Sequence, residues 1–207
     1  MPFTIEQFLE VFRAYNEAVY PAQWALFGIA VAAVVMSLPP AVDNGRRISA
    51  ILAVLWAWTG IAYHIAFFTG INPLAYVFGA MCIVQALLFV YHGVLRGRMR
   101  FDVWADAAGI TGTILIFFAL VAYPILGYLL GRVYPYSPTF GTPCPTTIFT
   151  FGILLWNRDR TPVHLIAIPF LWSLIGFSAA VSLSIREDMG LFLAGLVTAV
   201  FVVRNAR

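Results

Sequence analysis

Residues 105–130 read ADAAGITGTILIFFALVAYPILGYLL, a stretch of 26 residues in which Asp106 is the only charged member. A helix needs about 20 predominantly apolar residues to cross the hydrocarbon core of a bilayer, which is roughly 30 Å thick. This stretch exceeds that length, and it therefore predicts a helix that spans a membrane.

The whole chain has the composition of this stretch. Apolar residues make up 62% of its 207 positions and charged residues only 10%. A soluble core could not hide so much apolar surface from water, so the bilayer is the expected solvent. No linker or low-complexity tract divides the chain, and residues 1–207 are expected to form one polytopic membrane domain. Because the chain has no lysine, a retinal Schiff base is excluded.

Hydropathy divides the chain into several apolar segments separated by short polar loops. The fold class that we expect is an all-α integral membrane protein, a seven-helix transmembrane bundle preceded by an interfacial amphipathic helix. The fifth predicted span is only about half the usual length. The expected spans are residues 21–38, 48–69, 73–95, 105–130, 144–156, 162–185 and 187–203.

Residues 3–20 have a different pattern. Thr4 and Gln7 have the spacing of a capping box, and Phe3 and Phe8 have that of a hydrophobic staple. Apolar side chains recur along one face of the predicted helix, while Glu6, Glu10 and Glu17 make a cleaved signal peptide improbable. We expect this helix to lie in the membrane interface.

The arginines provide a test of the seven crossings, because short cytoplasmic loops collect positive charge. Seven crossings place nine arginines on one side of the membrane and three on the other. If the fifth segment turned back, the division would be six against six. The sequence thus predicts an N-terminus outside, a C-terminus in the cytoplasm and a bacterial inner-membrane location. The larger group is Arg46, Arg47, Arg96, Arg98, Arg100, Arg158, Arg160, Arg204 and Arg207.

The loop before the fifth span, residues 134–147, contains four prolines in fourteen residues. Such a loop can dip into a membrane protein only where its backbone groups are buried in protein or face a wet cavity. Cys144 falls at the predicted helix start with Pro145 at the first helical position, so free N–H groups would favour a thiolate. The alternative interpretation is a rigid plug in which Cys144 is simply small and apolar.

Several polar residues are expected at the same outer depth as this loop, where they would line an outward-facing polar cavity. Polar side chains within spans are costly and usually face the bundle interior, although a structural hydrogen bond is an equally ordinary explanation. The candidate ligand-binding residues are Asn16, Tyr63, His64, Asn72, Tyr123, Cys144 and Thr146.

Two pairs of residues are candidates for a metal or cofactor site. His64 and Cys144 can ligate zinc, copper or another soft metal, but two ligands fall short of the usual three or four. His92 and His164 lie near the inner ends of the third and sixth spans, where they can hold a haem or serve as interfacial residues. Asp106 is expected to pair with Arg96, Arg98 or Arg100. No cofactor is firmly implied.

Five segments carry a resemblance to a known family: residues 3–8, Tyr15-Asn16, Tyr63-His64, residues 71–73 and residues 142–150, which begin Thr-Pro-Cys-Pro-Thr-Thr. With them the chain resembles a family of bacterial multi-pass membrane proteins catalogued as a domain of unknown function. The resemblance covers most of the chain. It implies a membrane location and no activity, cofactor or substrate.

Two functional hypotheses remain open. The first is a transporter or binding protein for a small solute or a soft metal, which uses the outward-facing cavity. The second is a non-catalytic accessory or assembly subunit of a larger membrane complex. A thiol enzyme using Cys144 and a sensor are further alternatives. The expected partners are the lipid bilayer and other membrane subunits or a second copy of the chain, and not nucleic acid. The common hydrolase, metalloprotease and nucleotide-binding motifs are missing.

Overall fold

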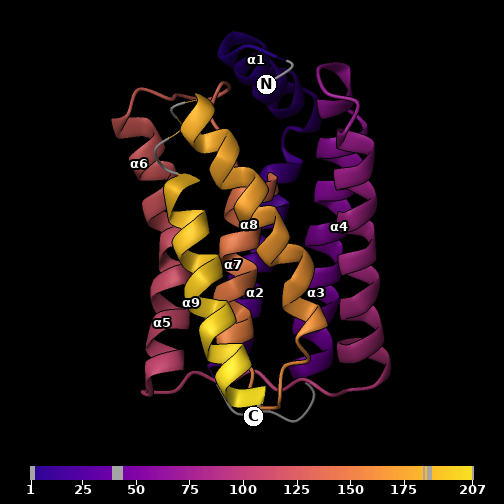
Figure 1. Ribbon diagram of the computed structural model, residues 1–207, viewed down its shortest axis with the longest axis vertical. Coiled ribbons are helices and arrows are strands. Elements are labelled where there is room, and N and C mark those ends of the chain that lie inside the picture. Colours follow the sequence, from indigo (N-terminus) through magenta and orange to yellow (C-terminus); the bar gives the residue numbers. More distant parts are fainter. Residues whose placement is uncertain (1–2, 39–43, 184, 186–187, 207) are drawn as a thin grey trace.

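The computed structural model describes residues 3–38, 44–183, 185 and 188–206. These residues form a bundle of helices, with α1 lying across one end (Figure 1). No β-strand occurs in the described ranges, where strand-like pairing is limited to two isolated bridges. The helices are α1 (Ile5–Val19), α2 (Ala22–Ser37), α3 (Asn44–Trp58), α4 (Ala75–Phe89), α5 (Ala107–Phe117), α6 (Tyr123–Leu129), α7 (Pro143–Leu155), α8 (His164–Leu183) and α9 (Met189–Ala206).

Each of the seven predicted spans is helical, but not every one has the length of a crossing. Among the described residues, four helices are long and apolar enough to cross a membrane: Asn44–Gly70, Ala75–Leu95, Ala107–Leu129 and His164–Leu183. The pair α1–α2, bent by 85°, makes a fifth if it is one broken span. The apolar helices α7 and α9 are shorter. The bundle is therefore all-helical with four or five such spans, and seven crossings remain a prediction.

Helix α1 has the start that the sequence predicts. The Thr4 hydroxyl accepts from the Gln7 amide N–H, the Gln7 side chain accepts from the Thr4 N–H, and the rings of Phe3 and Phe8 stack at 5.8 Å. Its apolar face packs on the end of the bundle, where Phe8, Phe12 and Tyr15 are buried in a cluster with Tyr63 and Phe68. The amphipathic pattern of α1 therefore reflects packing against protein. We call this end of the bundle the α1 end.

Three of the helical segments continue as π-helical turns: η1 (Thr59–Ile65), η3 (Val90–Leu95) and η4 (Phe118–Ala122). Turns of this kind are rare and frequently occur at functional sites. In this chain η1 carries His64, η3 carries His92, and η4 leads directly into Tyr123. The sequence analysis named all three of these residues as candidates for a functional site.

Helix α7 lies inside the bundle, surrounded by the others (Figure 1). Every residue of α7 except Cys144 is buried, and so are Phe140, Gly141 and Thr142 before it. Pro143, and not Pro145 as expected, occupies the first helical position after the N-cap residue Thr142. The end of the proline-rich loop, residues 140–142, thus reaches into the protein, as the sequence predicts.

Two pairs of glycines bring neighbouring helices into close contact. A Cβ placed on Gly152 of α7 would lie 2.8 Å from the Gly112 carbonyl oxygen of α5, and a Cβ on Gly112 would lie 2.7 Å from the Gly152 oxygen. Gly60 and Gly79 are related in the same way, at 2.8 and 3.0 Å, between η1 and α4. Small residues at such crossings let helix backbones approach closely within a membrane.

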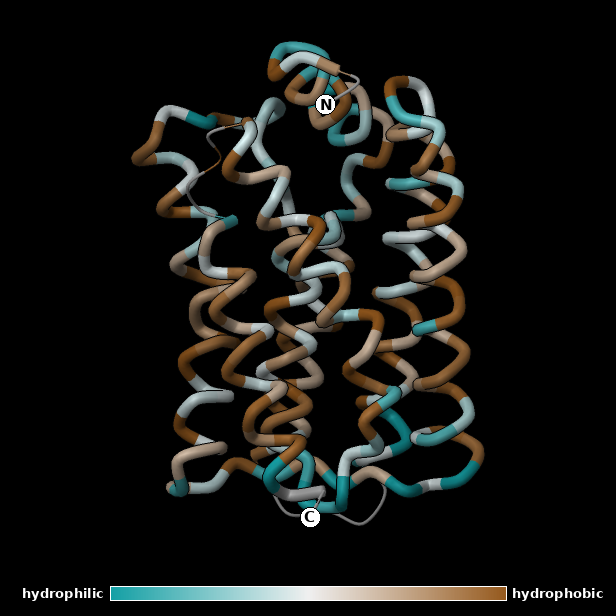
Figure 2. Tube along the Cα trace, viewed as in Figure 1, coloured by the Kyte–Doolittle hydropathy of each residue, from teal (hydrophilic) through white to brown (hydrophobic). Residues whose placement is uncertain are grey.

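At the end opposite α1, the loops joining the helices are hydrophilic, whereas the middle of the bundle is hydrophobic (Figure 2). The loops before α5 and after α7 pair with each other: Arg158 N donates to Arg100 O at 2.7 Å, and Asp102 N donates to Trp156 O at 3.0 Å. Because Arg100 and Arg158 lie in these loops, we call this end of the bundle the arginine end.

The glycine pairing of α5 and α7 leads to a stability prediction. In Gly152→Ala the added methyl group would lie 2.8 Å from the Gly112 oxygen and 2.6 Å from Ile116 Cγ1, so the two helices must separate. We expect a loss of about 1–3 kcal/mol of unfolding free energy, measured by denaturant titration in detergent.

The matched control is Gly28→Ala on α2, where an added methyl group meets nothing within 4 Å. Alanine favours a helix over glycine by up to about 1 kcal/mol, so this variant should be at least as stable as the parent protein. Equal stability of the Gly152 variant and the control would contradict the close crossing of α5 and α7.

Candidate functional site

Asn16, one of the predicted site residues, holds the proline-rich loop to α1. Its side-chain nitrogen donates to the carbonyl oxygens of Pro135 (2.6 Å) and Ser137 (2.8 Å), and its side-chain oxygen accepts from the Thr139 hydroxyl (2.7 Å). Its backbone oxygen accepts from Gln23 Nε2 at 2.7 Å. Asn16 is fully buried. It therefore connects α1, the start of α2 and the loop.

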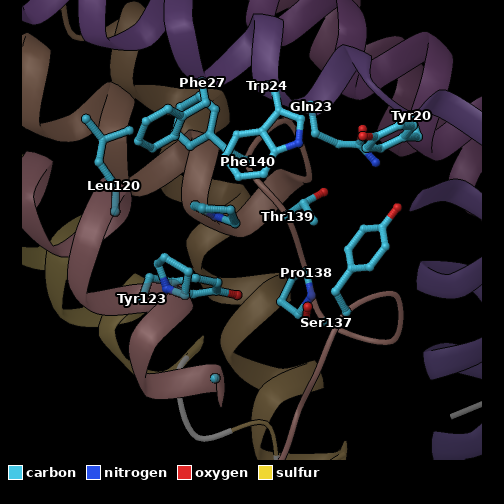
Figure 3. A pocket seen from close by; sticks show the side chains of 15 residues that line it. Tyr20, Gln23, Trp24, Phe27, Leu120, Tyr123, Ser137, Pro138, Thr139 and Phe140 are labelled. Carbon is cyan, nitrogen blue, oxygen red and sulfur yellow. The ribbon is translucent and has the colours of Figure 1, made fainter. Parts of the chain in front are cut away.

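A cavity of about 540 Å³ lies beside this connection, between the start of α2, the η4–α6 segment and the loop (Figure 3). We call it the large cavity. Its walls are mostly aromatic and aliphatic, including Trp24, Phe27, Leu120 and Phe140. Tyr20 and Trp24 are 63% and 69% exposed, so aromatic rings form its rim. Its volume is within the range of about 300–1,000 Å³ that is typical of sites for small molecules.

Two buried polar side chains line the large cavity. Gln23 is 7% exposed, and its Oε1 has no hydrogen-bond partner among the described residues, although its Nε2 is engaged. The Tyr123 hydroxyl donates to the carboxylate of Asp188, which is also buried. The walls of the cavity therefore contain one buried acceptor without a partner among the described residues and one tyrosine that already has a partner.

A second cavity, of about 150 Å³, lies below α1; we call it the small cavity. Three predicted site residues, Tyr63, Asn72 and Cys144, line it together with Trp172 and Asp188. Asn72 also has a structural part, because its Oδ1 accepts from the Leu74 N–H at 3.1 Å before α4 begins. The walls are largely aromatic, so the cavity is less polar than the sequence predicts.

The other two predicted residues at this end, His64 and Thr146, line neither cavity. His64 is fully buried among rings, and the nearest is that of Trp172, 4.9 Å away between ring centroids. Within the described residues, both ring nitrogens of His64 and the hydroxyl of Thr146 lack a hydrogen-bond partner. The predicted group is therefore divided between two cavities, a clamp and the buried core.

The described residues contain no group of three or more histidine, cysteine, aspartate or glutamate side chains placed to hold a metal ion. His64 and Cys144 thus gain no third ligand of these types. At the other end of the bundle, His92 and His164 contact each other directly, with 2.7 Å between their Nε2 atoms. This hydrogen bond connects η3 to the start of α8.

Asp106 has a different partner from the expected ones. Its carboxylate accepts from the Gly109 N–H as the N-cap of α5, and its other oxygen lies 3.6 Å from Arg158 Nη1. The Arg158 guanidinium also stacks on Trp104 at 3.3 Å. Burial lowers the pKa of Arg158, and the nearby Asp106 acts in the opposite direction. The prediction of Arg96, Arg98 or Arg100 is wrong because α7 delivers Arg158 to this position.

Three cavity residues with polar groups were not predicted from the sequence: Gln23, Trp172 and Asp188. Gln23 had a signal, because a glutamine in the first turn of an apolar helix is costly unless it faces the protein. Asp188 lies in a short connection between two predicted spans, where charged residues are usually exposed. Trp172 is one of many aromatic residues in apolar segments, and nothing in its local pattern distinguishes it.

Comparison with protein families gives one match: a model described as a family of unknown function, DUF6064, covers residues 5–207. This match confirms the resemblance to an uncharacterised family. No curated protein and no solved structure matches the chain.

The clamp formed by Asn16 can be tested with Asn16→Asp. The substitution replaces an N–H donor with a carboxylate oxygen that faces two carbonyl oxygens, so we expect a loss of about 1–3 kcal/mol in unfolding free energy, measured by thermal or denaturant unfolding in detergent. The control is Glu17→Gln, which changes an exposed neighbour and should cost under about 1 kcal/mol. Similar losses in the two variants would contradict the clamp.

Proposed function

The chain belongs to the DUF6064 family, whose description assigns no activity, and we propose that it is a membrane-embedded binding or transport protein for a small amphipathic solute. The observation that carries this proposal is the large cavity at the α1 end, with a volume of about 540 Å³ and mostly apolar walls. Cavities that combine apolar walls with a few placed polar groups are the usual form of small-molecule sites.

The chemistry of the walls defines the solute class. Trp24, Phe27, Leu120 and Phe140 favour an apolar body, because burying it removes hydrocarbon surface from water. The vacant Oε1 of Gln23 favours a ligand with an O–H or N–H donor, since a buried acceptor without a partner is costly. A long-chain or ring alcohol has both features.

The rim favours entry from the membrane interface. Tyr20, Trp24 and Tyr134 are exposed at the mouth of the cavity, and aromatic side chains of this kind concentrate at the depth of lipid headgroups. An amphipathic solute reaches the same depth by partitioning. The route from interface to cavity therefore needs no passage through bulk water.

The proposal includes a bacterial cytoplasmic membrane and seven crossings, with the α1 end outside. The described arginines of the larger group lie in loops at the arginine end or in the helix ends beside them. Short loops rich in arginine are retained on the cytoplasmic side of a membrane. Enclosure of α7 by the other helices supports its role as a short fifth crossing, because its length need not match the hydrocarbon thickness.

The orientation predicts which loops an impermeant maleimide can reach. In bacterial cells that produce a variant with Cys82 and Cys144 changed to serine, Tyr136→Cys should be labelled in intact cells. Val103→Cys should be labelled only after permeabilisation. Both positions are exposed in loops at opposite ends of the bundle, so they form a matched pair. The reverse pattern would contradict the orientation.

Solute binding can be tested with a diazirine-bearing decanol as a photoaffinity probe, followed by mapping of the labelled peptides. We expect labels on α2, η4–α6 and the proline-rich loop. Ala119 is a buried lining residue, and Ala119→Phe should fill the large cavity and reduce this labelling at least several-fold. The control is Ala32→Phe, which adds the same ring to an exposed position on α2.

A second probe pair tests the hydrogen bond to Gln23 without any mutation. The methyl ether of the same probe keeps the apolar body but cannot donate, so its labelling of the large cavity should be about 2- to 10-fold weaker. Equal labelling of the Ala119 and Ala32 variants would overturn the proposed function. Equal labelling by alcohol and ether would overturn the assignment of Gln23 as the ligand's acceptor.

A further inference from the structure

The small cavity is separate from the large one. Pro138 lines both cavities, and the Tyr123–Asp188 hydrogen bond joins a residue of the large cavity to a residue of the small one. A solute in the large cavity therefore does not fill the small cavity, which calls for its own explanation.

Trp172 lines the small cavity, and its indole N–H has no hydrogen-bond partner among the described residues. Trp172 is 8% exposed, and its Nε1 is buried without a hydrogen-bond partner among the described residues. A Cβ placed on Gly176 would lie 3.7 Å from this Nε1 and 3.8 Å from Cys144 Sγ. Leu191 Cδ2 would lie 2.7 Å from the same Cβ, so both polar atoms lie near Gly176 in a closely packed region.

The ring of His64, whose nitrogens have no hydrogen-bond partner among the described residues, packs against Trp172. The ring of His64 approaches the Trp172 ring edge-on, with 4.9 Å between centroids and 72° between planes. Its two nitrogens are buried and have no partner in the part of the chain that the structure describes. Buried polar atoms are paired in the great majority of cases, so the Trp172 N–H, which has no partner among the described residues, indicates a missing hydrogen-bond partner at the small cavity.

Size and charge restrict what this partner can be. A cavity of about 150 Å³ with apolar walls accommodates a molecule of the size of benzene. The carboxylate of Asp188 in the wall disfavours an anion. We propose that the small cavity is a binding site for a neutral, single-ring molecule whose oxygen accepts a hydrogen bond from Trp172 Nε1. This site is independent of the proposed solute in the large cavity.

The test uses the full-length protein in nanodiscs and 4-fluorophenol as the probe, observed by ¹⁹F NMR line broadening. The protein should broaden the 4-fluorophenol signal, and it should broaden that of 4-fluorotoluene less, because a methyl group cannot accept a hydrogen bond. Trp172→Phe retains an aromatic ring but removes the N–H, and should lower the affinity for 4-fluorophenol by about 2- to 10-fold. The control is Trp104→Phe, at an exposed position that lines neither cavity, which should leave the affinity unchanged.

A second measurement locates the probe in the unmodified protein. Cys144 lines the small cavity and is half-buried, whereas Cys82 is buried elsewhere in the core. Bound 4-fluorophenol should slow alkylation of Cys144 by N-ethylmaleimide, with Cys82 as the internal reference in the mass spectrum. This readout does not depend on whether the Trp172 variant folds.

Each alternative result overturns the inference. If trapped water alone occupies the cavity, 4-fluorophenol will show neither specific broadening nor protection of Cys144. If binding is lost in Ala119→Phe and retained in Trp172→Phe, the probe occupies the large cavity. Failure of the proposed function is distinguishable, because it appears as equal decanol labelling of Ala119→Phe and Ala32→Phe with 4-fluorophenol binding intact.

Discussion

The enclosure of α7 is the constraint on which the rest of the bundle depends. Thirteen residues make a helix of roughly 20 Å, too short for a hydrocarbon core of roughly 30 Å. Such a helix is tolerable only if its ends and the chain before it are satisfied by protein. The Thr59 hydroxyl lies 3.2 Å from the Gly141 oxygen, and the Thr142 hydroxyl donates to the Thr139 oxygen at 2.7 Å. The neighbouring helices must therefore surround α7, and the donors come from η1 and from the loop itself.

This requirement relates the π-helical turns to the site. A π turn interrupts the regular hydrogen bonding of an α-helix, and carbonyls at its edges then accept from other donors. At the start of η1 the Thr59 hydroxyl lies within hydrogen-bonding distance of both Leu55 O in its own helix and Gly141 O in the loop. The same turn carries Tyr63 to the small cavity and His64 to Trp172. One irregular turn thus supports the buried loop and positions the residues of the site.

The sequence predicted the features that depend on local pattern. Apolar runs predicted an all-helical bundle, and the capping box and staple of α1 are present because their contacts lie within one turn. Contacts between distant segments were not predictable in this way. Nothing near Asn16 indicates that it binds a loop about 120 residues later, and nothing near Asp106 indicates Arg158. For the same reason the sequence predicted one polar cavity where the structure has two. The position of a residue along a span predicts its depth in the membrane, but not the direction of its side chain.

The division into two cavities follows from the proline-rich loop. Asn16 fixes the loop at Pro135, Ser137 and Thr139, and this holds Pro138 between the two spaces. Buried polar atoms then differ on the two sides: the large cavity has an acceptor at Gln23, and the small cavity has a donor at Trp172. A ligand that donates is favoured on one side and a ligand that accepts on the other. Because Tyr123 and Asp188 bond across this wall, a change of either partner on one side alters the polar groups on the other.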